Sequence, residues 1–145
     1  MNSSSAPSIP ASAISRIQVG DQLQPFIRRT DFDNWNRYAA VNDEFLPHSM
    51  NDEAARREGF PKAFGMGNLQ WSYVHSLLRA FIGPDGSILR VDVQFRNPNL
   101  REQTVTAHGT VTGIDGTTVS IDLWTQEDEG ARLAVGKALV SLPSG

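Results

Sequence analysis

Apolar and polar residues alternate along most of the second half of the chain, which is the pattern of half-buried β-strands. Four such runs cover residues 87–96, 103–112, 117–126 and 132–142. The pair Asp115-Gly116 separates the second run from the third, and an Asp-Gly pair between alternating runs favours a tight hairpin turn. The pattern therefore predicts four strands that follow one another in a meander.

A stripe of apolar residues precedes these strands and repeats at the spacing of a helix. It predicts a helix from residue 69 to about residue 82, which ends at the turn-forming sequence Gly83-Pro84-Asp85-Gly86. The helix is nearly apolar enough to be buried on several sides. The stripe consists of Leu69, Tyr73, Leu77, Leu78 and Phe81.

The first half of the chain contains shorter elements. Residues 21–30 follow a Val-Gly-Asp turn and predict a first strand. Thr30 is suited to cap a helix, which apolar spacing predicts from there to about residue 41. Residues 42–51 contain a proline and lack a period, which indicates a loop. Residues 52–58 predict one or two further helical turns.

The order of elements is strand, helix, loop, long buried helix and four strands, which places the chain in the α+β class. A long apolar helix must be covered, and an antiparallel sheet curled around it is the simplest solution. We therefore expect one domain over residues 16–145. Residues 1–15 are rich in Ser, Ala and Pro, lack the features of a secretory signal, and are expected to form a flexible tail.

Composition narrows the kinds of function. With 145 residues, of which 39% are hydrophobic and 20% charged, the chain can bury the core of one ordinary domain. The net charge of −3 and the scattered Lys and Arg residues argue against nucleic acid as the main partner. The absence of cysteine excludes disulfides and thiolate chemistry and fits a cytoplasmic protein. No apolar run approaches the ~20 residues that span a bilayer, so no membrane partner is expected.

Histidine supplies acid–base chemistry near neutral pH, and the chain has three histidines. His75 and His108 have no carboxylates or second histidine at metal-ligand spacing, so we expect packing or surface roles and no metal site. His48 differs because it lies in a loop, five residues after Asp43. Such a pair can act as general acid and base, or it can serve only to satisfy backbone groups.

The residues before the long helix provide a second candidate feature. Gly65-Met66-Gly67-Asn68 leads into the helix, whose first N–H groups have no partner within the helix. These groups can hydrogen-bond a carbonyl oxygen that gains negative charge, and glycine lets a ligand approach the backbone. The glycines can equally serve to let the sheet approach the helix, and both interpretations stay open.

Together these features resemble the MaoC-like hydratase family, also called hydratase 2, over about residues 19–142. The family pattern of an Asp, four intervening residues and a His matches Asp43 and His48. Its Gly-Met-Leu type of turn into a central helix matches the sequence from Met66 to Leu69, which follows Gly59-Phe60-Pro61. Gln94-Phe95-Arg96-Asn97-Pro98 resembles its Arg-Phe-Arg-x-Pro strand. The resemblance implies the hotdog fold, in which a curved antiparallel sheet wraps a long central helix.

The resemblance also implies a function, namely (R)-specific hydration of trans-2-enoyl-thioesters or the reverse dehydration of 3R-hydroxyacyl-thioesters. By this resemblance, Asp43 and His48 hold the reacting water, and the backbone N–H of Gly67 polarises the thioester carbonyl. The implied substrate-binding residues are Met66, Asn68, Ser72 on the wall of the acyl pocket, and Arg96 as a contact of the CoA phosphates. A surface charge on the strand is the other interpretation of Arg96.

The chain departs from the family pattern at three places. Met50 stands where the family has the Asp of His-x-Asp, and Met66 stands where a histidine commonly precedes the helix glycine. The family's Asn-Pro before the histidine is shifted, so that Pro47 directly precedes His48. The spacing of the Asp and the His is kept. The differences therefore suggest an altered pocket more than a different class of reaction.

The resemblance implies an acyl-CoA or acyl carrier protein substrate, no cofactor other than the CoA thioester itself, and a homodimer or a heterodimer with a second hotdog chain. Pairing of two subunits would hide the exposed edge of an isolated sheet. Two other functions fit the same fold: an acyl-CoA thioesterase, and a non-catalytic or obligate partner subunit of a heteromeric hydratase. Release of CoA thiol from a saturated acyl-CoA would identify the thioesterase, and rescue by a second chain would identify the partner subunit.

Overall fold

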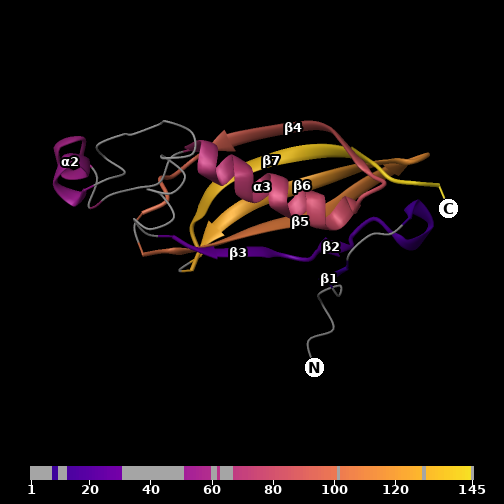
Figure 1. The fold of residues 1–145 in the computed structure, drawn as a ribbon, viewed down its shortest axis with the longest axis horizontal. Helices are drawn as coiled ribbons and strands as arrows, with labels where there is room; N and C mark the ends of the chain where they lie inside the picture. The colour runs from indigo at the N-terminus through magenta and orange to yellow at the C-terminus, as the bar shows by residue number, and fades with distance from the viewer. Residues whose placement is uncertain are drawn as a thin grey trace, which may run out of the picture.

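The computed structural model describes residues 8–9, 13–30, 51–59, 62, 67–100, 102–128 and 130–144. Within these residues, a curved sheet lies against a single long helix, α3, which runs along one face of the sheet (Figure 1). The largest cluster of buried side chains lies between the two. This arrangement confirms the expected α+β class and the expected sheet around a central helix.

The sheet of the described residues has seven strands in the spatial order β1-β2-β5-β6-β7-β4, and β3 also pairs with β5. Neighbouring strands are antiparallel, except that β1 and β2 are parallel. The strands are Ser8–Ile9 (β1), Gln22–Leu23 (β2), Phe26–Arg29 (β3), Ser87–Phe95 (β4), Thr104–Asp115 (β5), Thr118–Glu127 (β6) and Arg132–Ser141 (β7).

Only three of the four predicted C-terminal strands form a meander. β5, β6 and β7 pair in chain order, whereas β4 pairs with β7 at the far edge of the sheet. The predicted four-stranded meander is therefore wrong for β4. Alternation of apolar and polar residues determines which face of a strand is buried, but it carries no information about which strand lies beside it.

The N-terminal edge of the sheet is irregular and is built from short segments. The predicted first strand is divided into β2 and β3 at Gln24-Pro25, because proline has no N–H to donate to a neighbouring strand. β1 pairs with β2, and the Ile14 N–H donates to the Pro143 carbonyl at 3.0 Å. Residues 8–9 and 14–15 of the expected tail therefore contact the rest of the described fold, the latter as part of the 3-10 helix Ile14–Arg16. The boundary between tail and domain stays a prediction.

The long helix α3 spans Gly67–Ile82, so it begins earlier than the predicted residue 69 and ends as predicted. Gly83 ends it in the left-handed conformation, with φ of 69°, and the Gly83 N–H donates to the Arg79 carbonyl at 3.1 Å. The side chains of α3 that pack on the sheet are at most 4% exposed, and they are Tyr73, Val74, Leu77, Leu78, Phe81 and Ile82.

The central strands bury one face and leave the other open. On β6, Ile121 and Leu123 face α3 and are at most 2% exposed. The residues between and beside them, Asp122 and Trp124, lie on the opposite face, which we call the outer face. The outer face is mostly polar, as expected for an antiparallel sheet with one buried side.

A short helix, α2, spans Asp52–Arg57 and matches the prediction. Asn51 caps it, because its side-chain oxygen accepts a hydrogen bond from the Ala54 N–H at 2.7 Å. The predicted helix from Thr30 to about residue 41 and most of the predicted loop after it lie outside the described residues. Within the described part, no helix combines the length and apolarity needed to cross a bilayer.

Candidate active site

Of the predicted site, the structure describes the first turns of α3, with Gly67, Asn68 and Ser72, and Arg96 after β4. Gly67 is the first residue of this 16-residue helix, so its N–H is among those that a helix leaves without an internal partner. Asn68 follows in the first turn, and Ser72 lies on the next turn, half-buried. The aligned peptide dipoles give this end of the helix a partial positive charge, which can stabilise a developing oxyanion.

The predicted acid–base pair, Asp43 and His48, lies outside the described residues, as does Met66. Their convergence with Gly67 around a substrate therefore stays a prediction from the sequence. The structure describes the surroundings of Thr30, which precedes that segment in the sequence, and of the start of α3.

A buried hydrogen bond holds the start of α3 on the sheet. Gln70 is 3% exposed, and Thr125 on β6 has no exposed surface. The hydroxyl of Thr125 donates to the side-chain oxygen of Gln70 at 2.9 Å. Because a hydrogen bond between buried groups is strengthened by the low dielectric around it, this one fixes the position of Gly67, one turn earlier. The pair was not predicted, and its only signal is a polar residue in the first turns of an otherwise apolar helix.

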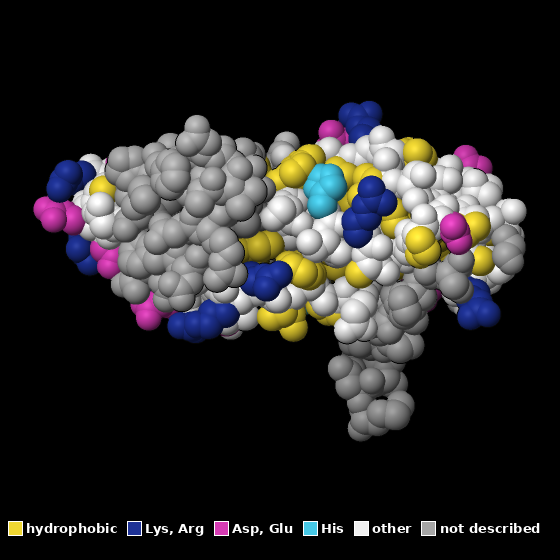
Figure 2. Space-filling model, viewed as in Figure 1, with side chains coloured by type: hydrophobic (Ala, Val, Ile, Leu, Met, Phe, Trp, Pro, Cys, Tyr) yellow, Lys and Arg dark blue, Asp and Glu magenta, His cyan; other side chains and the backbone are white. Residues whose placement is uncertain are grey.

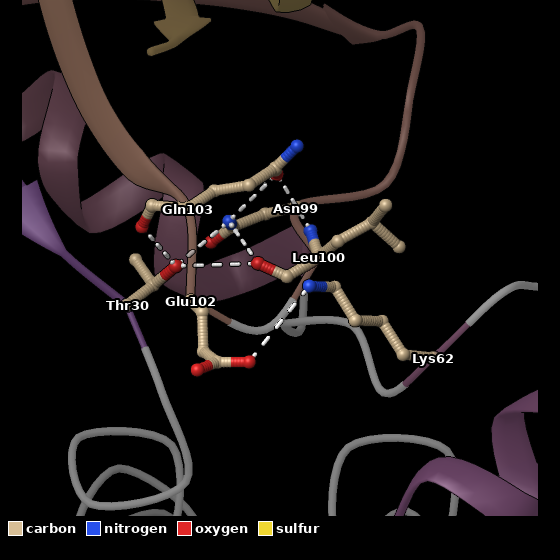
Figure 3. Close-up of polar contacts among 6 residues, drawn as sticks. All are labelled: Thr30, Lys62, Asn99, Leu100, Glu102 and Gln103. Carbon is tan, nitrogen blue, oxygen red and sulfur yellow. Dashed lines mark hydrogen bonds and ion pairs between the residues drawn. The ribbon is translucent and has the colours of Figure 1, made fainter. Parts of the chain in front are cut away.

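A second polar network surrounds Thr30, the last described residue before the segment that contains Asp43 and His48 (Figure 3). The Thr30 hydroxyl donates to the Gln103 carbonyl at 2.8 Å and accepts from the Asn99 amide at 2.9 Å. The Gln103 side-chain oxygen accepts from the Leu100 N–H at 2.8 Å. Thr30 and Asn99 are at most 1% exposed, so this network fixes the point at which the chain leaves the sheet.

The same network reaches the end of β6 and the segment between α2 and α3. Glu127, 8% exposed, accepts from the Ala131 N–H at 2.7 Å and from the Gln103 amide at 3.2 Å. Lys62 pairs with Glu102 at 3.9 Å, between partly exposed side chains (Figure 3). The buried polar residues of the described part all lie at the end of the sheet where α3 begins, and they are Thr30, Gln70, Asn99, Thr125 and Glu127.

Tyr73 places a hydroxyl group in the core without a hydrogen-bond partner among the described residues. Its ring lies 5.9 Å from that of Phe26, and the Arg28 guanidinium lies 5.1 Å above the Phe26 ring. Burial raises the pKa of Tyr73 to about 12, against a smaller opposing effect of Arg28. Tyr73 and Phe81, from the apolar stripe of the predicted helix, are core residues.

The side of the molecule that carries α3 shows apolar side chains among a few basic ones (Figure 2). On this helix, His75 and Trp71 are half-buried and their rings lie 5.2 Å apart, while the His75 Nδ1 lies 3.1 Å from the Trp71 carbonyl oxygen. His108 lies on the opposite side, stacked on Trp124. Both histidines therefore have the packing roles expected for them. Among the described residues, no three His, Asp or Glu side chains are grouped to hold a metal ion.

Arg96, the predicted contact of the CoA phosphates, directly follows β4 and is exposed. Its guanidinium donates to the side-chain oxygen of Gln94 at 2.9 Å. The two side chains are neighbours on one face of the strand, so the hydrogen bond is local. The position is open to a ligand from solution, and the phosphate contact stays a prediction.

Comparison with known proteins bears on the fold. No family model matches this sequence, and no curated protein sequence matches it. The unliganded R-hydratase PhaJ1 from Pseudomonas aeruginosa is similar in structure, with a TM-score of 0.84 and 15% identity over 92% of this chain and 87% of that one. An (R)-hydratase from A. caviae involved in PHA biosynthesis has a TM-score of 0.80 and 24% identity, over 88% and 98%. The ChsH1–ChsH2 complex from Mycobacterium tuberculosis has a TM-score of 0.78 and 18% identity, over 86% and 98%.

These structural similarities show that this chain is a hotdog-fold protein. The hotdog fold implied by the MaoC-like resemblance is therefore confirmed. Because the identities are 24% or lower, the comparisons establish the fold alone. The reaction has to be inferred from the residues of this chain.

Proposed function

We propose that this chain is a MaoC-like hydratase that adds water to trans-2-enoyl-thioesters to form 3R-hydroxyacyl-thioesters, and that also catalyses the reverse dehydration. The observation that carries the proposal is the position of Gly67 as the first residue of the 16-residue helix α3, where the resemblance requires a backbone donor. Two solved (R)-hydratases share the fold that presents such a helix. The spacing of Asp43 and His48 adds an acid–base pair to this donor.

In the proposed reaction, Asp43 and His48 hold one water molecule beside the double bond. The water oxygen forms a bond to Cβ while ionised Asp43 accepts a proton from it and His48 orients the water. That same proton then passes from Asp43, by way of His48, to Cα of the enolate, which restores both side chains. The electrons of the double bond move towards the thioester carbonyl as the enolate forms. The Gly67 N–H stabilises this oxyanion, and one such donor contributes about 3–4 kcal/mol at comparable sites.

Two described contacts support this assignment of the site. The hydrogen bond between Gln70 and Thr125 holds the helix end that presents the Gly67 N–H. The network around Thr30 anchors the residue from which the segment with Asp43 and His48 departs. An oxyanion donor is effective only when it is held in place before the reaction, because reorganisation during the reaction would cost part of its effect.

The proposed substrate is an acyl-CoA, with an acyl carrier protein thioester as the second carrier. Met66, Asn68 and Ser72 are proposed to contact the acyl part, and Arg96 the phosphates of CoA. The reaction adds only water and needs no further cofactor. We propose a homodimer as the assembly. A heterodimer with a second hotdog chain is the alternative, for which the two-chain ChsH1–ChsH2 complex is a precedent of the same fold.

The proposal is tested with crotonyl-CoA and longer enoyl-CoAs, by following the loss of absorbance of the conjugated thioester. We expect the purified chain to be active, and Asp43→Asn and His48→Ala each to lose at least about a hundredfold in kcat, as expected for general acid–base groups. Asp85→Asn, in the turn after α3, and His108→Ala, on the outer face, serve as matched controls and should keep most activity.

Three outcomes would contradict the proposal. Wild-type rates in both Asp43→Asn and His48→Ala would show that these two residues are not the acid–base pair. Release of CoA thiol from saturated acyl-CoAs, without hydration of enoyl-CoAs, would favour the thioesterase. Inactivity of the folded chain alone, with activity restored by a second hotdog chain whose own residues are essential, would make this chain a non-catalytic partner.

A further inference from the structure

The outer face of the sheet contains a hollow on the side away from α3. Its volume is about 800 Å³, which lies within the range of pockets that hold small ligands. Four adjacent strands contribute to it, from β5 at one side to β4 at the other. The side chains that the argument uses are Asp92, Thr110, Asp122, Trp124, Arg132 and Lys137.

Trp124 forms a rigid aromatic platform at one end of this hollow. The ring of His108, from β5, stacks on it at 5.3 Å with an interplanar angle of 20°. The guanidinium of Arg132, from β7, lies 4.6 Å from the centre of the Trp124 rings. The indole N–H donates to the side-chain oxygen of Gln126 at 3.3 Å. The stacking on Trp124 favours this orientation of the Arg132 side chain, because a guanidinium stacks favourably on an aromatic face.

The two cations in the hollow have no acidic partner among the described residues. Arg132 and Lys137 are absent from the ion pairs of this part of the chain, whereas Asp92 is paired with Arg90 at 2.7 Å. Asp122 is the one acidic residue of the lining that is not engaged in a described ion pair. Burial, and to a smaller extent Arg132, lower the pKa of His108, which favours the neutral form of its ring. Lys137 lies opposite Asp92 and Asp122 in the sheet, whereas Arg132 lies opposite Gln126, so Arg132 is the basic residue of the lining without an acidic cross-strand neighbour.

We propose that this hollow binds a small organic anion whose carboxylate or phosphate group pairs with the guanidinium of Arg132. Arg132 is suited to this role because it is stacked on Trp124, carries no described acidic partner, and presents a planar set of donors that matches two oxygens of such a group. Lys137 and the hydroxyl of Thr110 lie along the same hollow and supply further donors. Asp122 disfavours ligands with negative charge at both ends, so the favoured ligand carries its anionic group at the Arg132 end.

The site is tested by NMR titration of the full chain with inorganic phosphate and with acetate, against sodium chloride at equal ionic strength. The reporter is the indole N–H signal of Trp124, one of three tryptophans, assigned by its loss in Trp124→Phe. We expect saturable shifts of this signal with one or both anions and none with chloride. If phosphate causes the stronger response of this signal, the ligand carries a phosphate group, and if acetate does, it carries a carboxylate.

The matched variants are Arg132→Gln and Arg79→Gln, which each remove one exposed positive charge, the second from α3 on the other side of the sheet. Arg132→Gln should weaken binding at least about tenfold, since it removes a charge-assisted hydrogen bond. Arg79→Gln should leave it within twofold, because Arg79 does not line the hollow. Arg132→Lys, which keeps the charge and loses the planar donors, should be intermediate.

Equal binding by Arg132→Gln and Arg79→Gln would overturn the proposal and indicate general attraction to positive charge. Absence of any saturable shift of the Trp124 indole signal with both anions would overturn it as well. The proposal does not depend on the hydratase function, so these outcomes and those of the enoyl-CoA assay are independent.

Discussion

The hydroxyl group of Tyr73 is the buried polar atom of the described side chains that lacks a hydrogen-bond partner. Leaving such a group unpaired in the core costs about 1–3 kcal/mol. Tyr73→Phe removes the hydroxyl and keeps the ring beside Phe26. We therefore expect this variant to be as stable as the parent chain or more stable, by about 1 kcal/mol at neutral pH, as measured by urea unfolding.

The same variant has a second signature at high pH. The unfolded chain releases the tyrosine proton near pH 10, whereas the folded chain holds that of Tyr73 until about pH 12. Between these values the folded state binds more protons, so the free energy of unfolding falls as pH rises, by up to about 1.4 kcal/mol per pH unit. Tyr73→Phe should abolish this fall, and Tyr38→Phe should keep it. A clear loss of stability in Tyr73→Phe at neutral pH would instead show that the hydroxyl has a partner.

Among the strands, the close approach of β4 to β7 depends on a glycine. A Cβ atom at Gly136 would overlap the carbonyl oxygen of Asp92 and would lie 2.9 Å from the Val93 Cα, both on β4. These contacts are with backbone, which cannot move aside without separating the two strands. We expect Gly136→Ala to lower the free energy of unfolding by at least about 2 kcal/mol, as measured by urea or thermal unfolding.

Gly113, on β5, supplies the matched control for this experiment. A Cβ atom there would lie 3.6 Å from the Ser120 Cβ, which is ordinary van der Waals contact. Gly113→Ala should therefore change stability by less than about 1 kcal/mol, and it can even stabilise the fold by reducing the entropy of the unfolded chain. Equal effects of the two substitutions would show that β4 adjusts to a side chain at position 136.

The hydrophobic pattern predicted most elements of the described part. It failed where contacts between residues distant in sequence determine the structure. α2, α3 and the strands β4 to β7 occur close to their predicted positions, because local periodicity reports which face of an element is buried. The break at Pro25 and the pairing of β4 with β7 were not predicted. Both depend on which strand lies alongside, and that is a property of the whole sheet.

For the whole molecule, the unpaired edge of β4 predicts association. Within the described sheet, β4 has a neighbour on one side only, and Leu89 and Phe95 on it are 53% and 49% exposed. Antiparallel pairing of two β4 edges would satisfy the free backbone groups and cover both apolar side chains. We expect a dimer in analytical ultracentrifugation, and a shift towards monomer in Leu89→Lys and Phe95→Lys.

Ile114→Lys is the control for this prediction. Ile114 is also a large exposed apolar residue, at 38%, but it lies near the hairpin between β5 and β6. Its substitution should leave the dimer intact. If the chain is a monomer at all concentrations tested, or if all three substitutions act alike, the β4 edge is not the interface.

The candidate site was only partly accessible to prediction. The glycine that opens α3 could be identified because a glycine before a long apolar stripe is a local signal. The network that joins Thr30 to Asn99 and Gln103 could not be, because its members are about 70 residues apart in sequence. Trp124 and Arg132 meet on the outer face for the same reason, since they lie on different strands.

The sequence alone determined the class of fold, the bounds of most elements, and the chemical types available to a site, because these follow from local periodicity and residue chemistry. The tertiary structure decided the order of strands in the sheet, the buried contacts that hold the start of α3, and the hollow on the outer face. Each of these requires side chains from separate elements to share one place. The free energy that stabilises these features comes from burial and hydrogen bonding between distant parts of the chain. The sequence of a single segment does not show which distant residues it will contact.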